Sequence, residues 1–89
     1  MNMSMKKWFS FLSKHGKVEA ERKALKRNWK AVRSVMTMYA RGGNYYAYYH
    51  GFIYEENLKR LAAEGFKLKK QRNELSRSIY WTISWEDIE

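Results

Sequence analysis

The sequence contains no cysteine and no proline. Without cysteine, the chain forms neither disulfide bonds nor thiolate metal sites, which excludes disulfide scaffolds and zinc-finger-like modules. This absence is typical of an intracellular protein. The absence of proline fits short connections and few rigid loops.

Long apolar runs are also missing. The longest near the N-terminus, residues 8–12 (Trp-Phe-Ser-Phe-Leu), covers five positions after Lys6 and Lys7. A secretory signal needs an apolar region of about 7–15 residues, and a membrane-spanning helix needs about 20. We therefore expect neither, and we expect the chain to be cytoplasmic.

Acidic residues are scarce in the first half of the chain. Residues 1–41 hold eleven Lys/Arg but only Glu19 and Glu21, whereas residues 42–89 hold seven of each sign. The whole net charge of +9 therefore lies in the first half. A charge asymmetry of this kind predicts an anionic partner rather than a particular fold.

Aromatic residues are abundant, with four Trp, seven Tyr and four Phe. Each buries about 150–250 Å², so few are needed for the core of a small domain. The chain of 89 residues is expected to form a single domain, 1–89. Its parts are a basic helical half, 1–41, and a neutral β-α-β-β half, 42–89.

The spacing of apolar residues predicts a short first helix over about residues 4–14. Asn2 or Ser4 can provide its N-cap, and Gly16 is expected to break it. The apolar residues of this helix fall on one face: Met5, Trp8, Phe9 and Leu12.

A second helix is predicted over about residues 18–40, ended by Gly42 and Gly43. Its apolar and basic residues occupy opposite arcs at 100° per residue, as an amphipathic helix requires. The apolar arc consists of Leu25, Trp29, Val32, Val35, Met36 and Tyr39, and the basic arc consists of Arg22, Lys23, Lys26, Arg27, Lys30 and Arg33.

The second half predicts one more helix and three strands. The helix covers about 53–64, and Gly65 is placed to end it. The strands cover about 44–51, 66–72 and 78–85, with alternating apolar and polar residues in the last. The expected fold class is α+β in the order α-α-β-α-β-β, with a small antiparallel three-stranded sheet.

The basic arc of the second helix is the first candidate binding site. Cations at helical spacing can follow a phosphate backbone. A solvated face that keeps the protein in solution is the alternative, although such a face usually mixes charges of both signs. The predicted contacts to an anionic partner are Arg22, Lys23, Lys26, Arg27, Lys30 and Arg33.

Four tyrosines within residues 45–49 form the second candidate site. Strand alternation places Tyr45, Ala47 and Tyr49 on one face and Tyr46 and Tyr48 on the other. Core packing explains one such face. Tyr46 and Tyr48 are the predicted aromatic contacts, because outward tyrosines stack on bases or anchor protein interfaces.

Other functions find little support in the sequence. His15 and His50 have no partner at metal-binding or catalytic spacing, so we expect no enzyme, no catalytic residue, no metal and no cofactor. The first helix has apolar and lysine residues suited to an anionic membrane. A small core would also use its aromatics, so membrane binding is not expected.

Four segments of the second half form a pattern: Glu-Asn-Leu-Lys at 56–59, Leu61, Gly-Phe-Lys-Leu at 65–68 and Tyr-Trp-Thr-Ile-Ser-Trp at 80–85. In these segments the chain resembles small accessory proteins of bacteriophages and prophages of Gram-positive bacteria. The resemblance covers about a third of the chain and implies a helix, a glycine-aromatic step and a closing hairpin, with no catalytic residue.

Proteins of this kind bind host machinery, so the resemblance implies a non-enzymatic modulator of a host nucleic-acid-handling or defence complex, acting in the host cytoplasm. The basic arc and the tyrosines would contact that host protein or nucleoprotein. The alternative is a stand-alone DNA- or RNA-binding protein, a small regulator held by phosphate contacts and base stacking. A third possibility is capture of a small anionic nucleotide in a basic pocket.

Overall fold

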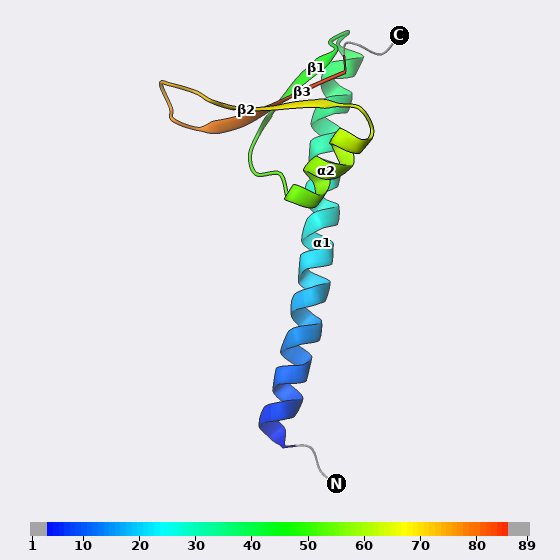
Figure 1. The fold of residues 1–89 in the computed structure, drawn as a ribbon, viewed down its shortest axis with the longest axis vertical. Helices are drawn as coiled ribbons and strands as arrows, with labels where there is room; N and C mark the ends of the chain where they lie inside the picture. Colours follow the sequence, from blue (N-terminus) through cyan, green and yellow to red (C-terminus); the bar gives the residue numbers. More distant parts are fainter. Residues whose placement is uncertain (1–3, 86–89) are drawn as a thin grey trace.

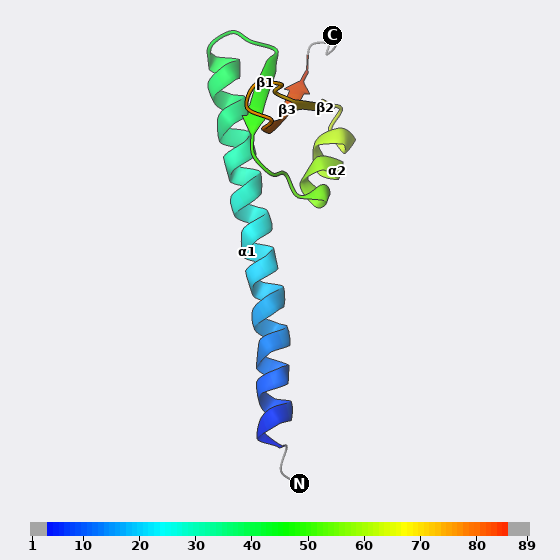
Figure 2. The same ribbon diagram turned by 90° about the vertical axis from the view of Figure 1, so that its left-hand side faces the viewer.

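The computed structural model describes residues 4–85, so the predicted cap at Asn2 lies outside the described residues. The elements follow the order α1 (Met5–Arg41), β1 (Tyr46–His50), α2 (Glu55–Ala63), β2 (Lys67–Arg72) and β3 (Ile79–Ser84). A long helix, a short helix and a small sheet make up an α+β fold (Figure 1). The sheet and α2 pack against the C-terminal half of α1, and the N-terminal half of α1 extends beyond them (Figure 2).

The two helices predicted for the first half are one continuous helix. The predicted break at Gly16 is wrong, and the element order is α-β-α-β-β. A glycine inside a helix costs only about 1 kcal/mol relative to alanine, and the neighbouring Lys, Glu and Ala residues favour helix. The helix begins where predicted, because the Ser4 hydroxyl accepts a hydrogen bond of 3.3 Å from the Lys7 amide.

The three strands form one antiparallel sheet in the order β1-β3-β2. The last strand is therefore the central one, and α2 carries the chain from one edge of the sheet to the other (Figure 1). In β1, Tyr46 pairs with Ser84 and His50 pairs with Tyr80; in β2, Lys67 pairs with Ser84 and Arg72 pairs with Ile79. This register determines which side chains share a face.

The core lies between the inner face of the sheet, α2 and the C-terminal half of α1. Its fully buried residues include Val32 of α1, Leu61 of α2 and Ile83 of β3. The predicted alternation in the last strand is confirmed for Trp81, Ile83 and Trp85, which all pack in this core, whereas Ile79, predicted on the same face, is 42% exposed at the start of the strand. Fully burying an aliphatic side chain stabilises the fold by about 1.5–3 kcal/mol.

Two asparagines fasten α2 to α1. Asn57 is only 6% exposed. Its side-chain amide donates to the backbone carbonyl of Leu25 at 3.1 Å and to the side-chain oxygen Oδ1 of Asn28 at 3.0 Å. The Asn28 amide donates to the Phe52 carbonyl at 2.8 Å, and its oxygen also accepts from the Tyr54 amide at 3.0 Å. The helix therefore begins at Glu55 rather than at residue 53, with its entry loop attached to α1.

The C-terminus of α2 is closed as the sequence predicts. Gly65 has a φ of 95°, which favours glycine. The Gly65 amide donates to the Ala62 carbonyl and the Phe66 amide to the Leu61 carbonyl, the pattern of a Schellman motif. Phe66 then packs against the core.

Candidate nucleic-acid interface

The structure separates the predicted site residues into two surfaces. All six cations of the predicted basic arc are exposed along α1, and we call them the basic ridge; five point away from the core, whereas Arg33 lies at the border and also lines a cavity between α1 and α2. Within residues 4–85, the one ion pair on this ridge joins Arg22 to Glu19 at 3.7 Å. The ridge members are Arg22, Lys23, Lys26, Arg27, Lys30 and Arg33.

The ridge is positioned by the residues on the opposite side of the same helix. Val32 is fully buried, and Trp29 and Met36 pack against the core. Because the side chains of a helix recur every 3.6 residues, burying this stripe forces the cations between them outward. The surface is a row of exposed charges without an enclosed site.

Tyr46 and Tyr48 lie on a different surface, the outer face of the sheet. Between them Ala47 points inward and is fully buried, so β1 alternates as predicted. Tyr46 and Tyr48 remain 40% and 39% exposed. The predicted inward position of Tyr45 is not observed, because this residue precedes β1 and is 62% exposed.

The two tyrosines belong to a larger group that sequence reasoning missed. The ring centroids of Tyr46 and Tyr48 lie 5.3 Å apart, and the Tyr48 ring meets that of Tyr80 at 5.8 Å. His50 continues the row at 5.3 Å from Tyr80. Tyr39 of α1 contacts Tyr46 and Tyr48 at 6.2 and 6.1 Å. We call these five residues the tyrosine platform: Tyr39, Tyr46, Tyr48, His50 and Tyr80.

The register also brings lysines to the same face as the tyrosines. One row across the sheet runs Tyr46, Ser84, Lys67, and the next runs Tyr48, Thr82, Lys69. Neighbouring strands lie about 4.8 Å apart, so tyrosine and lysine backbones in one row are separated by about 10 Å. Each of the two rows therefore combines an aromatic ring, a hydroxyl group and a cation.

A basic edge strand has a structural explanation of its own. Lysines on an exposed edge prevent sheets from pairing edge to edge, and β2 is an edge strand with the sequence Lys-Leu-Lys-Lys-Gln-Arg. The lysines alone would thus indicate little. Their repeated alignment with partly exposed tyrosines is what distinguishes this face.

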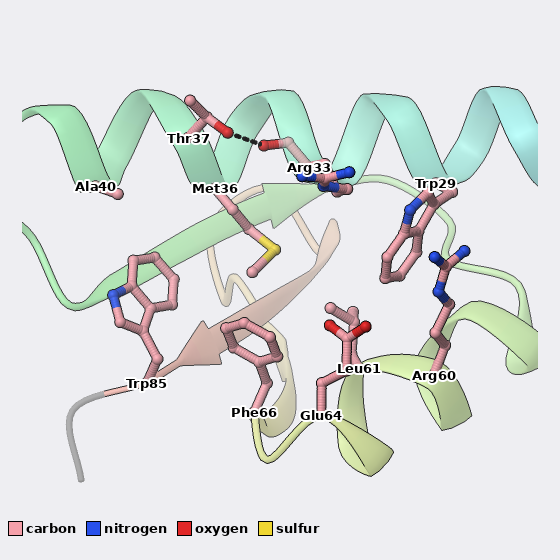
Figure 3. Close-up of a pocket in the computed structure, with 10 residues that line it drawn as sticks. All are labelled: Trp29, Arg33, Met36, Thr37, Ala40, Arg60, Leu61, Glu64, Phe66 and Trp85. Carbon is pink, nitrogen blue, oxygen red and sulfur yellow. Dashed lines mark hydrogen bonds between the residues drawn. The ribbon is translucent and has the colours of Figure 1, made fainter. Parts of the chain in front are cut away.

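A cavity of about 440 Å³ lies between α1, α2 and the end of β3 (Figure 3). Trp29 and Arg60 lie at one end, where the guanidinium carbon is 4.0 Å from the ring centroid, and Phe66 and Trp85 lie at the other. Arg33 and Arg60 both line it, but so does Glu64. This carboxylate opposes an anionic ligand, so the cavity gives little support to the predicted nucleotide pocket.

The chain matches no protein-family model, no curated protein and no solved structure. The resemblance to small phage and prophage proteins thus stays a prediction.

Proposed function

We propose that this protein is a non-enzymatic nucleic-acid-binding protein that holds a single strand on the outer face of its sheet. The observation that carries this proposal is the pair of rows in which Tyr46 and Tyr48 align with Lys67 and Lys69 across β3. Bases stack on the tyrosines, and phosphates lie against the lysine side of the sheet. The sequence predicted a stand-alone DNA- or RNA-binding regulator as the alternative function, and this proposal adds the form of the nucleic acid and the surface that binds it.

The geometry favours a single strand over a duplex. Stacking on a protein ring needs a base whose own face is free, and the bases of a duplex already stack on one another. The outer face of the sheet also offers no helix that could enter a major groove, and the basic ridge of α1 is the surface that a duplex would use instead. Each stacked base contributes about 1–3 kcal/mol and depends little on sequence.

The basic ridge would act during association, before the strand reaches the tyrosine platform. It lies on α1, facing away from the core, so it does not form one surface with the platform. A group of positive charges raises the rate at which an anionic partner associates. At physiological salt the attraction extends about 8 Å from the surface. The ridge therefore attracts a strand, and the platform holds it.

Docking on a host nucleic-acid-handling or defence complex is the second candidate. The observation that favours it is the separation of the two surfaces, because the ridge would stay available to a protein while the platform holds a strand. A pull-down from a host lysate with and without nuclease separates the two candidates. A host protein retained after nuclease would favour docking, and proteins lost with nuclease would favour nucleic-acid binding alone.

The direct test measures the affinity for fluorescent single-stranded DNA and RNA oligonucleotides, with a duplex of equal length for comparison. Tyr48→Ala should weaken single-strand binding by roughly 5- to 150-fold, the equivalent of one lost stacking contact. Tyr45→Ala is the matched control, since Tyr45 is exposed but lies outside the strand. It should change the affinity less than about twofold.

Two results would contradict the proposal. One is equal loss of affinity in the two variants, which would mean that the platform has no special part. The other is tighter binding of the duplex than of either single strand, which would indicate that nucleic acid binds the basic ridge and not the platform.

A further inference from the structure

The N-terminal part of α1 has no partner within the described chain. Residues 5–18, which we call the arm, project beyond the sheet and α2 (Figures 1 and 2), and every one of them is exposed. The expectation that their aromatics fill the core is wrong. Trp8 is 49% exposed and Phe9 and Phe11 are each 54% exposed.

The arm is amphipathic by itself. At 100° per residue its six large apolar side chains lie within about half of the helix circumference. The opposite half holds Lys6, Lys7, Lys14 and Lys17 with two serines, and residues 5–18 include no acid. The apolar members are Met5, Trp8, Phe9, Phe11, Leu12 and Val18.

The apolar side of the arm does not continue into the side that packs on the core. Counting along the helix from Trp8 to Val32, the two apolar stripes are centred roughly 140° apart. The elements that pack on the core-facing stripe of α1 therefore lie on a different side of the helix from the apolar residues of the arm. The side of α1 that continues the apolar stripe of the arm is instead the basic ridge of residues 22–33.

One side of a single helix thus presents an apolar half followed by a basic half, with Glu19 between them paired to Arg22 at 3.7 Å. A surface that matches this side of α1 must offer an apolar layer to the arm and negative charge to the basic residues. We propose that this side of α1 lies on the surface of an anionic lipid membrane, with the arm's apolar residues among the acyl chains. The ridge and the flanking lysines then face the headgroups.

A second copy of the chain fits this side less well. A coiled coil needs apolar positions that alternate three and four residues apart over at least three heptads. The arm's seam of Met5, Trp8 and Leu12 runs into His15 and then Glu19. Parallel pairing of two copies would also bring two basic ridges together, and like charges repel.

The contact is with the membrane surface, because no helix in the described range 4–85 combines the length and apolar character needed to cross a bilayer. A surface helix places its apolar face about 5–10 Å into the boundary between headgroups and acyl chains. The tyrosine platform, on the outer face of the sheet, remains in water. Membrane binding therefore leaves the platform accessible to a strand, and the two proposals share only the basic ridge.

The test is co-sedimentation of the whole protein with vesicles of phosphatidylcholine, with and without about one quarter phosphatidylserine. The wild-type protein should partition at least about tenfold better onto the anionic vesicles. The variant Phe9→Gln with Leu12→Gln should lose at least about tenfold. The control, Ser10→Gln with Ser13→Gln, changes the opposite side of the arm and should behave as wild type.

Charge variants provide a second measurement. Lys26→Gln and Lys30→Gln should each weaken partitioning onto anionic vesicles by about fivefold, with no effect on neutral vesicles. Tyr48→Ala should partition as wild type, so a failure of nucleic-acid binding and a failure of membrane binding are told apart. Circular dichroism checks that each variant is folded.

The proposal is overturned if anionic and neutral vesicles bind equally, if neither binds, or if the Phe9/Leu12 variant sediments as wild type does. Analytical ultracentrifugation tests the other occupant. Self-association that the Phe9/Leu12 variant abolishes, together with no vesicle binding, would assign this side to a second copy. Capture of a protein partner through the arm without vesicle binding would equally contradict the proposal.

Discussion

Removing the Asn28 side chain should loosen the attachment of the loop before α2 to α1 without disturbing the apolar core. This amide makes three hydrogen bonds: it donates to the Phe52 carbonyl at 2.8 Å and accepts from the Tyr54 amide and the Asn57 amide, both at 3.0 Å. The substitution Asn28→Ala eliminates all three. The loop that leads into α2 then loses its anchor on α1.

The cost follows from the exposure of the partners. A typical intramolecular hydrogen bond contributes about 0.5–1.5 kcal/mol net, and a buried partner left unsatisfied costs more. Phe52 and Tyr54 are exposed to water, whereas Asn57 is buried but keeps its bond to the Leu25 carbonyl. We therefore expect the free energy of unfolding to fall by about 2 kcal/mol. In a domain of this size the melting temperature should fall by roughly 8–16 °C.

Denaturant unfolding followed by circular dichroism measures this change, with Asn28→Asp as the matched control. A carboxylate still accepts from Tyr54 and Asn57 but cannot donate to Phe52, so the control should lose only about 1 kcal/mol. A loss below about 0.5 kcal/mol in Asn28→Ala would refute the anchoring role. A control as unstable as the alanine variant would show that the two accepted bonds contribute nothing.

Two further predictions concern the helix and the sheet. A Cβ atom at Gly16 would meet nothing within 4 Å, so Gly16→Ala should increase helix content and stabilise α1 by up to about 1 kcal/mol, measured by circular dichroism on heating; a decrease in helicity would contradict the open surroundings. Lys69→Gln should reduce the slope of log affinity against log salt for a single strand by about 0.7, and Lys59→Gln, on the exposed side of α2, should leave it unchanged. An unaltered slope in Lys69→Gln would remove the phosphate contact from β2.

The features predicted correctly are those determined by residues close to one another in the sequence. The apolar stripe of residues 25–39, the closure of α2 at Gly65 and the alternation of β3 are all confirmed. Each depends on periodicity or on one glycine conformation. The error at Gly16 has the opposite origin, since a local breaker was outweighed by the helix on both sides of it.

The larger part of the candidate site could not be found from the sequence. Tyr80 and Lys69 join Tyr48 only through the register of three strands, with β3 between two strands that precede it. Alternation in residues 78–85 does place Tyr80 on the polar side, but not beside any particular tyrosine. The contact between Asn28 and Asn57 spans 29 residues and carries no local signal.

The unequal packing of α1 implies that its backbone is not uniformly stable. Isolated helices shorter than about 12–15 residues are marginal in water, and residues 5–18 are exposed throughout and project beyond the sheet and α2, so no tertiary packing adds to their stability. Backbone amides should therefore exchange with deuterium fastest near Trp8, and protection should rise toward Val32. The C-terminal half of this helix would then open only with the whole domain, while its first four turns open and close by themselves.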